Sequence, residues 1–119
     1  MPAYEVETWT FESQEAEAGF LAGITAWFEF VGTHLALFPD WLSASCTREL
    51  DGQGQATGRY RMTFEYASAA SITEYRSQRS AGQSGYEEYD ALDVGEIFID
   101  PNRIVVNHWE EIEGADWHT

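Results

Sequence analysis

The sequence predicts an α+β domain, in which helices cover one face of a single antiparallel sheet. Three observations lead to this prediction. A long apolar stripe lies between Phe20 and Phe38, two neighbouring runs between Trp41 and Tyr66 alternate in polarity, and strand-like runs stand near both ends of the chain. With 119 residues, the chain is expected to form one domain over residues 1–119.

The long helix is predicted by the spacing of its large apolar residues. At about 100° per residue they fall within an arc of roughly 120°, a stripe that faces a core. These residues are Phe20, Leu21, Ile24, Trp27, Phe28, Val31, Leu35 and Phe38. Ser13 is the expected N-cap, and the helix should end before Pro39, because the residue preceding a proline disfavours the α conformation.

Three glycines lie within this helix. Gly19, Gly23 and Gly32 each lower its intrinsic stability by about 1 kcal/mol relative to alanine. The helix must therefore be stabilised by packing against the rest of the domain.

The other elements follow from alternation of polarity, turn residues and caps. We expect strands at Tyr4–Phe11, Trp41–Leu50, Arg59–Tyr66, Val94–Ile99 and Arg103–Ile112, a second helix at Ser68–Ser80, a helical turn at Tyr86–Leu92, and turns at Asp51–Gly58 and Asp100-Pro101-Asn102. This order is the β-α-β-β-α-β arrangement of a ferredoxin-like domain, with one extra strand in the last hairpin.

The charge is strongly negative, with 21 acidic residues, six arginines, no lysine and a net charge of -15. The acids are spread along the chain from Glu5 to Asp116. Salt would screen their repulsion, since the Debye length is roughly 3 Å at 1 M, and such a surface is typical of proteins from salt-loving microbes. We therefore expect a salt-adapted protein, with an acidic surface for a basic partner as the alternative. Nucleic acid is not an expected partner, because phosphate binding needs clustered cations.

The single cysteine, Cys46, excludes an internal disulfide and a cysteine-based metal cluster. The N-terminus lacks the basic and apolar regions of a signal peptide, and Glu29 and His34 interrupt the helix stripe, so no membrane span is expected. A cytoplasmic location is the resulting expectation. The sequence contains no phosphate loop, zinc spacing, dinucleotide signature or Ser-His-Asp order.

Both faces of the predicted sheet carry large apolar residues. The first strand places Tyr4 and Val6 on one face and Trp9 and Phe11 on the other. Two helices can cover only one face, so we expect an identical sheet to pack on the second face about 10 Å away, forming a homodimer. The alternative is that Trp9 and Trp109 shield the ends of the sheet.

Three segments, FPDWLSASCTREL, GRYRMTFEYASAASITEYRSQRS and YEEY, resemble the hairpin and second helix of the dimeric α+β barrel superfamily, in particular its antibiotic-biosynthesis-monooxygenase-like domains. The resemblance implies a ferredoxin-like fold, a homodimer through the sheets, and a pocket between helices and sheet. Members of this superfamily include cofactor-independent oxygenases of aromatic polyketides and haem-degrading enzymes. The haem-degrading branch uses an asparagine on the first strand and a histidine on the second helix, and both are absent here.

Two histidines are candidate catalytic bases, because the pKa of histidine lies near neutrality. His34 stands at the edge of the helix stripe and His108 on the last strand; the alternative for each is a structural histidine bonded to its neighbours. Together with Glu110 they would make a two-histidine, one-carboxylate iron site, but nothing in their spacing brings them together, so no metal is expected. His118, near the end of the chain, is expected to be hydrated.

Aromatic residues could line a cavity for a flat apolar ligand, although such residues more often fill a core. The candidates for substrate binding are Trp27, Tyr60, Tyr66 and Tyr75, with Arg61 as a clamp for an anionic group. Arg61 and its neighbour Arg59 could instead pair with carboxylates. Four acidic residues are interpreted as a hydrated surface: Glu87, Glu88, Asp90 and Asp93.

Two functions remain open from the sequence. One is a small monooxygenase-like enzyme that oxidises an aromatic or apolar molecule without a cofactor, with His34 or His108 as base. The other is a non-enzymatic dimeric module that binds a ligand or a partner. A cavity that holds a histidine beside tyrosine hydroxyls would favour the enzyme, and a filled core would favour the module.

Overall fold

A computed structural model describes residues 1–82, 84–117 and 119 of the chain. Four strands form one antiparallel sheet in the order β2-β3-β1-β4. These strands are β1 (Ala3–Thr10), β2 (Trp41–Leu50), β3 (Ala56–Tyr66) and β4 (Val105–Glu110). β1 is central and pairs with both β3 and β4. The α+β ferredoxin-like fold predicted from the sequence is therefore confirmed.

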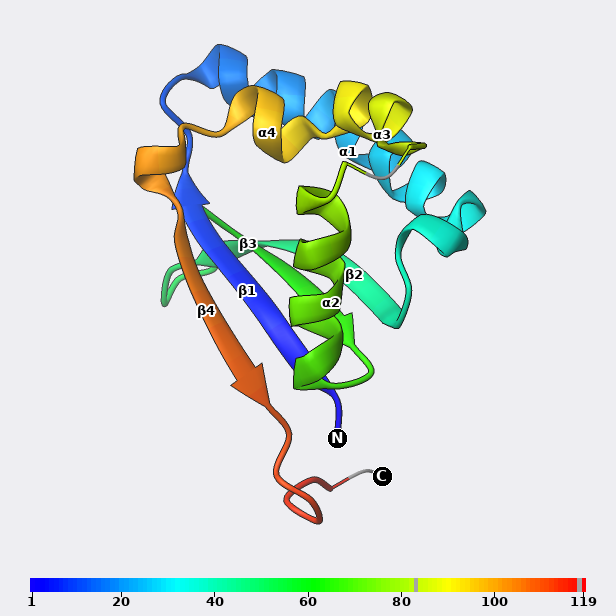
Figure 1. Cartoon of the computed structure of the whole chain (residues 1–119). Helices are drawn as coiled ribbons and strands as arrows, with labels where there is room; N and C mark the ends of the chain where they lie inside the picture. The colour runs from blue at the N-terminus through cyan, green and yellow to red at the C-terminus, as the bar shows by residue number, and fades with distance from the viewer. Residues whose placement is uncertain (83, 118) are drawn as a thin grey trace.

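The helices lie on one side of this sheet, as Figure 1 shows. They are α1 (Gln14–Thr33), α2 (Ala69–Ser80), α3 (Tyr86–Leu92) and α4 (Val94–Phe98), with short 3₁₀ turns at Leu35–Leu37 and Pro101–Arg103. α2 packs on β1 and β3, whereas α1 packs on α3 and α4. Within the helical layer, α2 therefore packs against the sheet, and α1 spans the space above the sheet.

The predicted strand at Val94–Ile99 is wrong, because this segment forms α4. The Asp93 side chain caps the helix by accepting a hydrogen bond of 3.1 Å from the Glu96 backbone N–H. Val94 and Ile99 are buried against the core. A short apolar run fits a strand or a buried helical turn equally well, and here the cap and the packing on α1 decide for the helix.

The long helix also differs from its prediction at its end and on its surface. It ends at Thr33, and the chain continues through His34 into a 3₁₀ turn before Pro39. Within the predicted apolar stripe, Leu21 and Leu35 are 39% and 62% exposed, whereas Phe30 outside it is buried. Leu35 is exposed because it lies beyond the end of α1, in the 3₁₀ turn, and Phe30 is buried because it packs on Tyr89 of α3 with ring centroids 6.1 Å apart.

Two glycines of α1 allow α4 to approach closely. A Cβ added at Gly19 would lie 2.4 Å from a ring carbon of Phe98, and one added at Gly23 would lie 2.5 Å from a methyl carbon of Val94. Gly32, in contrast, has no heavy atom within 4 Å of such a Cβ. The sequence treats all three glycines as weak points of the helix, but two of them form its contact with α4.

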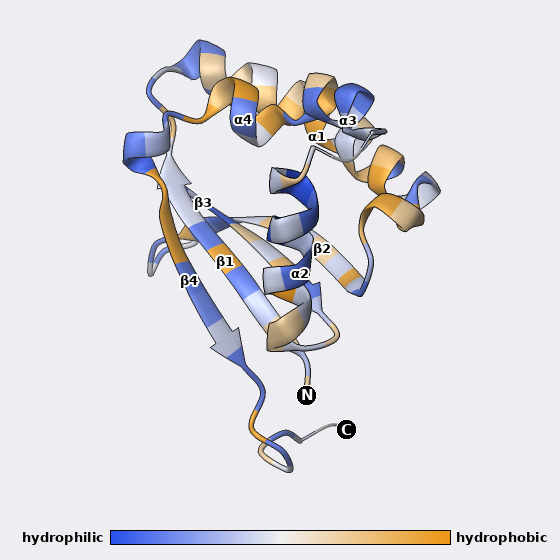
Figure 2. Ribbon diagram, viewed as in Figure 1, coloured by the Kyte–Doolittle hydropathy of each residue, from blue (hydrophilic) through white to orange (hydrophobic). Residues whose placement is uncertain are grey.

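The sheet has one covered and one open face. Ala3 and Trp9 of β1 are buried on the covered face, where Trp9 packs on Phe20 of α1 with ring centroids 5.4 Å apart. Strongly hydrophilic residues also stand in the middle of β1 (Figure 2), at Glu5 and Glu7, and they share this covered face. A carboxylate on the covered face of a central strand requires a polar or hollow environment.

We predict that Gly23→Ala lowers the free energy of unfolding by about 1–3 kcal/mol, because the new methyl group overlaps Val94. Gly32→Ala is the matched control and should raise the free energy of unfolding by about 0.5–1 kcal/mol, since alanine is the better helix former and the site is open. Urea unfolding followed by circular dichroism measures both. Equal stabilisation by the two substitutions would contradict the close packing of α4 on α1.

Candidate functional site

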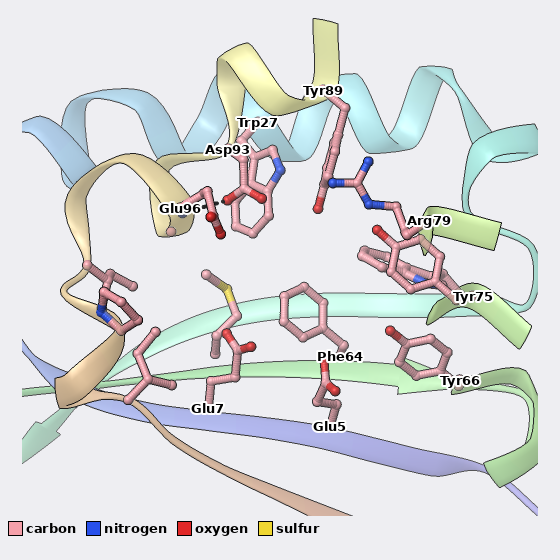
Figure 3. A pocket seen from close by; sticks show the side chains of 16 residues that line it. Glu5, Glu7, Trp27, Phe64, Tyr66, Tyr75, Arg79, Tyr89, Asp93 and Glu96 are labelled. Atoms are coloured by element: carbon pink, nitrogen blue, oxygen red, sulfur yellow. Dashed lines mark hydrogen bonds between the residues drawn. The ribbon is translucent and has the colours of Figure 1, made fainter. Parts of the chain in front are cut away.

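A cavity of about 250 Å³ lies between the sheet and the helical layer. Figure 3 shows α1 above it, the strands beneath it, α2 at one side and α4 at the other. Its walls consist of Glu5, Glu7, Trp27, Trp41, Met62, Phe64, Tyr66, Tyr75, Arg79, Tyr89, Asp93, Gly95, Glu96, Ile99, Pro101 and Ile104. Segments from most of the chain thus contribute to it.

Aromatic rings hold the cavity open. Trp27 of α1 contacts Phe64 of β3 with ring centroids 6.2 Å apart, and Trp41 of β2 lies 5.1 Å from Phe64 and 5.0 Å from Tyr75 of α2. On β3, alternation of side chains brings Phe64 and Tyr66 to the same face. These rigid rings separate α1 from the sheet and give the cavity flat apolar walls.

Carboxylates gather at one end of the cavity, where Glu7 of β1 faces Asp93 and Glu96 of α4 (Figure 3). Glu5 also lines the wall, but it is already paired: its Oε1 accepts from Arg76 and lies 3.0 Å from Nε2 of His108. Asp93 is engaged as the cap of α4. The site therefore has an acidic end in which Glu5 and Asp93 are engaged by the protein itself and Glu96 is exposed to solvent.

Glu7 is the exception. No hydrogen bond or ion pair joins its carboxylate to another residue in the described part of the chain. Burial raises its pKa to about 7, helped by the negative charges of Glu5, Asp93 and Glu96, while the positive charge of Arg76 acts in the opposite direction. Burial likewise raises the pKa of Asp93. At neutral pH Glu7 can therefore accept or release a proton readily.

Hydrogen-bond donors gather at the other end. The side chains of Tyr66, Tyr75, Tyr89 and Arg79 lie there in Figure 3, from β3, α2 and α3. Burial raises the pKa of Tyr66 and Tyr89, and raises that of Tyr75 to about 12, so these hydroxyls are protonated at neutral pH. Arg79 is fixed by a 2.6 Å ion pair with Asp90. This end can donate hydrogen bonds to an oxygen atom of a ligand.

Two further polar groups at this end have no partner. The indole N–H of Trp41 is buried with no acceptor in the described part of the chain, and no hydrogen bond joins the hydroxyl of the buried Tyr66 to another described residue. Buried donors normally have an acceptor, because leaving one unmade costs about 1–3 kcal/mol. A ligand oxygen or water in the cavity would supply one.

Three of the predicted substrate-binding residues, Trp27, Tyr66 and Tyr75, line the cavity. Tyr60 lies elsewhere: its ring packs between Trp9 and Phe11, and its hydroxyl donates to Glu17 at 2.7 Å.

Arg61 is exposed on the open face of the sheet, away from the cavity. Its neighbour Arg59 lies 3.6 Å from Glu49, the carboxylate pairing given as its alternative.

Neither predicted catalytic histidine lines the cavity. His34 stacks on Phe30 with centroids 3.8 Å apart, and its Nδ1 lies 2.9 Å from the Phe30 carbonyl oxygen. His108 sits on the outer side of Glu5, 2.9 Å from Nη2 of Arg76. Their roles as bases stay predictions. His118 lies outside the described residues.

In the described part of the chain, no group of three or more His, Cys, Asp or Glu side chains could hold a metal ion. The interpretation of Asp93 as a hydrated surface residue is wrong, since it caps α4 and lines the cavity.

Glu5 and Glu7 are the site residues that the sequence interpretation missed. The available signal was their position: they alternate along β1 with the same face as Ala3 and Trp9, both of which are buried. An acidic pair on the apolar face of a strand is uncommon and indicates a functional or paired site.

No helix in the described ranges is long and apolar enough to cross a membrane.

Comparison with known proteins shows a likeness in structure. No known protein family and no curated protein matches the sequence. A Bordetella bronchiseptica protein, provisionally described as an antibiotic biosynthesis monooxygenase, matches with a TM-score of 0.61 at 16% identity, over 93% of this chain and 97% of that chain. A dimeric ferredoxin-like protein from Jannaschia matches with a TM-score of 0.62 at 11% identity, over 93% of this chain and 100% of its own.

The cofactor-independent oxygenase SnoaB from Streptomyces nogalater is also similar, with a TM-score of 0.54 at 14% identity and 96% of both chains covered. At these identities the likeness concerns the fold alone. The chain therefore has the ferredoxin-like fold that monooxygenase-like proteins share.

The unpaired Glu7 carboxylate predicts a pH-dependent stability. Below pH 4.5 it is protonated in both states; as the pH rises to about 7, the unfolded chain loses this proton while the folded chain retains it, so the fold loses stability. Above pH 7 the penalty is constant. Glu7→Gln should therefore be more stable than the natural chain at pH 8 by about 1–3 kcal/mol, and this difference should vanish near pH 4.

Urea unfolding at several pH values measures this difference. Glu110→Gln, a change at an exposed carboxylate of β4, is the matched control and should show little pH-dependent difference. A Glu7→Gln advantage that is the same at pH 4 and pH 8 would contradict the raised pKa of Glu7.

Proposed function

We propose that this protein is a small cofactor-independent oxygenase that binds an aromatic or otherwise apolar molecule in the cavity between helices and sheet. The observation that carries the proposal is the cavity itself, which combines flat aromatic walls with an acidic end and a donor end. Its volume, about 250 Å³, is near the lower limit for ligand sites and suits a molecule of one or two rings. The fold it shares with a cofactor-independent oxygenase supports the proposal.

Such a reaction needs no electron donor besides the substrate. Loss of a proton leaves a stabilised carbanion, which transfers its electrons to O₂ and binds oxygen to give a hydroperoxide. Loss of water from the hydroperoxide then converts the original CH₂ group into a carbonyl, so that one oxygen atom enters the product and the other leaves as water. Tyr66 would stabilise the anion by donating a hydrogen bond to its oxygen, as a preorganised donor in a site that excludes bulk water.

The second candidate is a non-enzymatic binding module. It is favoured by one observation: the cavity holds tyrosine hydroxyls but neither of the predicted histidine bases. Binding without turnover separates this candidate from the first.

Oxygen uptake and binding by one preparation test both candidates. The protein, dialysed against a chelator and free of flavin and haem absorbance, is mixed with one- and two-ring phenols and aryl ketones. We expect quenching of tryptophan fluorescence through Trp27 and Trp41, and oxygen uptake with at least one compound. Tyr66→Phe should lower that uptake about 100-fold by removing the donor, whereas Tyr4→Phe on the open face should not. Binding without uptake would support the module, and no binding at all would overturn both.

The open face of the sheet is the proposed dimer interface. Val105 and Trp109 of β4 are 55% and 62% exposed there, and they stand opposite Thr8 and Tyr4 of β1. Apolar residues on an otherwise uncovered sheet face favour packing against a second copy. Two structurally similar proteins, from Jannaschia and from an uncultured marine organism, are described as dimeric.

Light scattering should give about twice the 13.5 kDa chain mass. Trp109→Glu should yield monomers, because it places a charge among the apolar residues of β4 on the open face. Trp117→Glu is the matched control: Trp117 is 81% exposed but lies beyond β4, so the dimer should persist. A monomeric natural chain would overturn the proposed interface.

We also propose that the acidic surface is an adaptation to salt. At a net charge of -15, repulsion among the carboxylates opposes folding in dilute buffer, and salt screens it. The midpoint of thermal unfolding should therefore rise steeply between low and molar sodium chloride, and level off as screening saturates. An unfolding temperature that does not respond to salt would remove this proposal.

A further inference from the structure

From the proposed function and the geometry of the cavity, we infer that Glu7 is the proton acceptor of the site, and that its substrate is a neutral molecule with an acidic C–H or O–H conjugated to an oxygen. The proton would lie at the acidic end of the cavity and the oxygen at the donor end. This assignment replaces a histidine base with a carboxylate from the central strand β1.

Glu7 is the cavity carboxylate that is free to accept a proton. Four carboxylates line the cavity, but Glu5 is paired with Arg76 and His108, Asp93 caps α4, and Glu96 is exposed. Glu7 alone among them is largely buried and has no partner in the described part of the chain. A base must be free to make a new bond to the proton, and Glu7 meets this requirement without breaking an existing contact.

The surroundings of Glu7 raise its affinity for a proton. Glu7 faces Glu5 on its own strand and Asp93 and Glu96 on α4, and these negative charges favour its protonated form. Arg76 of α2 reduces the effect without cancelling it. A base works best when its pKa is near the working pH, because it is then partly ionised and still binds a proton strongly. An ordinary surface glutamate would be ionised but too weak a base.

The two ends of the cavity carry different polar groups. Figure 3 places Glu7 at one end and the hydroxyls of Tyr66 and Tyr75 at the other, with the aromatic walls between them. When the C–H or O–H bond breaks, the proton moves to an Oε of Glu7 and the electron pair stays on the ligand. Conjugation carries the new negative charge to the oxygen, away from Glu7 and toward the hydroxyls of Tyr66 and Tyr75. The total charge of the occupied cavity does not change.

The same polarity determines the substrate class. A ligand that enters as an anion meets Glu5, Asp93 and Glu96 as well as Glu7, with Arg79 already bound to Asp90. A neutral ligand avoids this repulsion and becomes charged only inside, where the donors can receive the charge. The expected substrates are therefore enolisable aryl ketones and phenols that also carry a conjugated carbonyl oxygen, and carboxylates, sulfates and phosphates are excluded.

Hydrogen–deuterium exchange of β-tetralone, a two-ring ketone with an acidic C–H, tests proton removal without oxygen. Exchange in D₂O under nitrogen is followed by NMR, and binding by tryptophan quenching. The protein should accelerate exchange, with a rate that rises with pH and levels off above about pH 7. Glu7→Gln should lower the rate about 100-fold while the ketone still binds. Glu7→Asp should recover part of the rate, and His34→Gln, a change at a residue outside the cavity, should leave it unchanged.

Several outcomes would overturn the inference: no binding of the ketone, binding without accelerated exchange, or equal exchange by Glu7→Gln and the natural chain. Exchange that depends on Glu7, with no oxygen uptake from any compound, would support the base and reject the oxygenase. Oxygen uptake that survives Glu7→Gln would support the oxygenase and reject Glu7. The two proposals can therefore fail separately.

Discussion

The distance between α1 and the sheet is the constraint on which the rest of the structure depends. α1 packs directly on α3 and α4, with Gly19 and Gly23 allowing α4 to come close, but it meets the sheet mainly through large rings. The contacts of Phe20 with Trp9 and of Trp27 with Phe64 are rigid and wide. Rings of this size cannot collapse into the remaining space as flexible side chains would, so a cavity persists between the layers.

Because of the cavity, β1 can carry the Glu7 carboxylate on its covered face. In a filled core the Glu7 carboxylate would require a charged partner or stay protonated well above neutral pH. Here it borders a hollow space, so its pKa is about 7 and it is unpaired. The same hollow leaves the Trp41 indole N–H without an acceptor in the described part of the chain, and no hydrogen bond joins the Tyr66 hydroxyl to another described residue. Each of these groups lowers the stability of the folded chain, and such costs are typical of functional sites.

The two faces of the sheet differ in what covers them, although the same strands form both faces. On the covered face, aromatic packing and a few carboxylates line a cavity. On the open face, apolar residues such as Val105 and Trp109 lie among polar ones, at a surface that a second copy could cover. Helices occupy only one face because both crossovers of a ferredoxin-like chain return on the same side.

The sequence by itself determined the elements whose patterns are long and regular: α1, the β2–β3 hairpin, α2 and the turn before β4, hence the fold class. It also assigned Trp27, Tyr66 and Tyr75 to inner faces by their periodicity, and these residues line the cavity, whereas their contact with a ligand stays a prediction. Only the tertiary structure decided that the segment at 94–98 is a helix, since its contact with two glycines of α1 joins residues far apart in the sequence. It alone decided that Glu7 faces a cavity while His34 and His108 do not, because the pairing of strands and the width of stacked rings cannot be read from spacing along one chain.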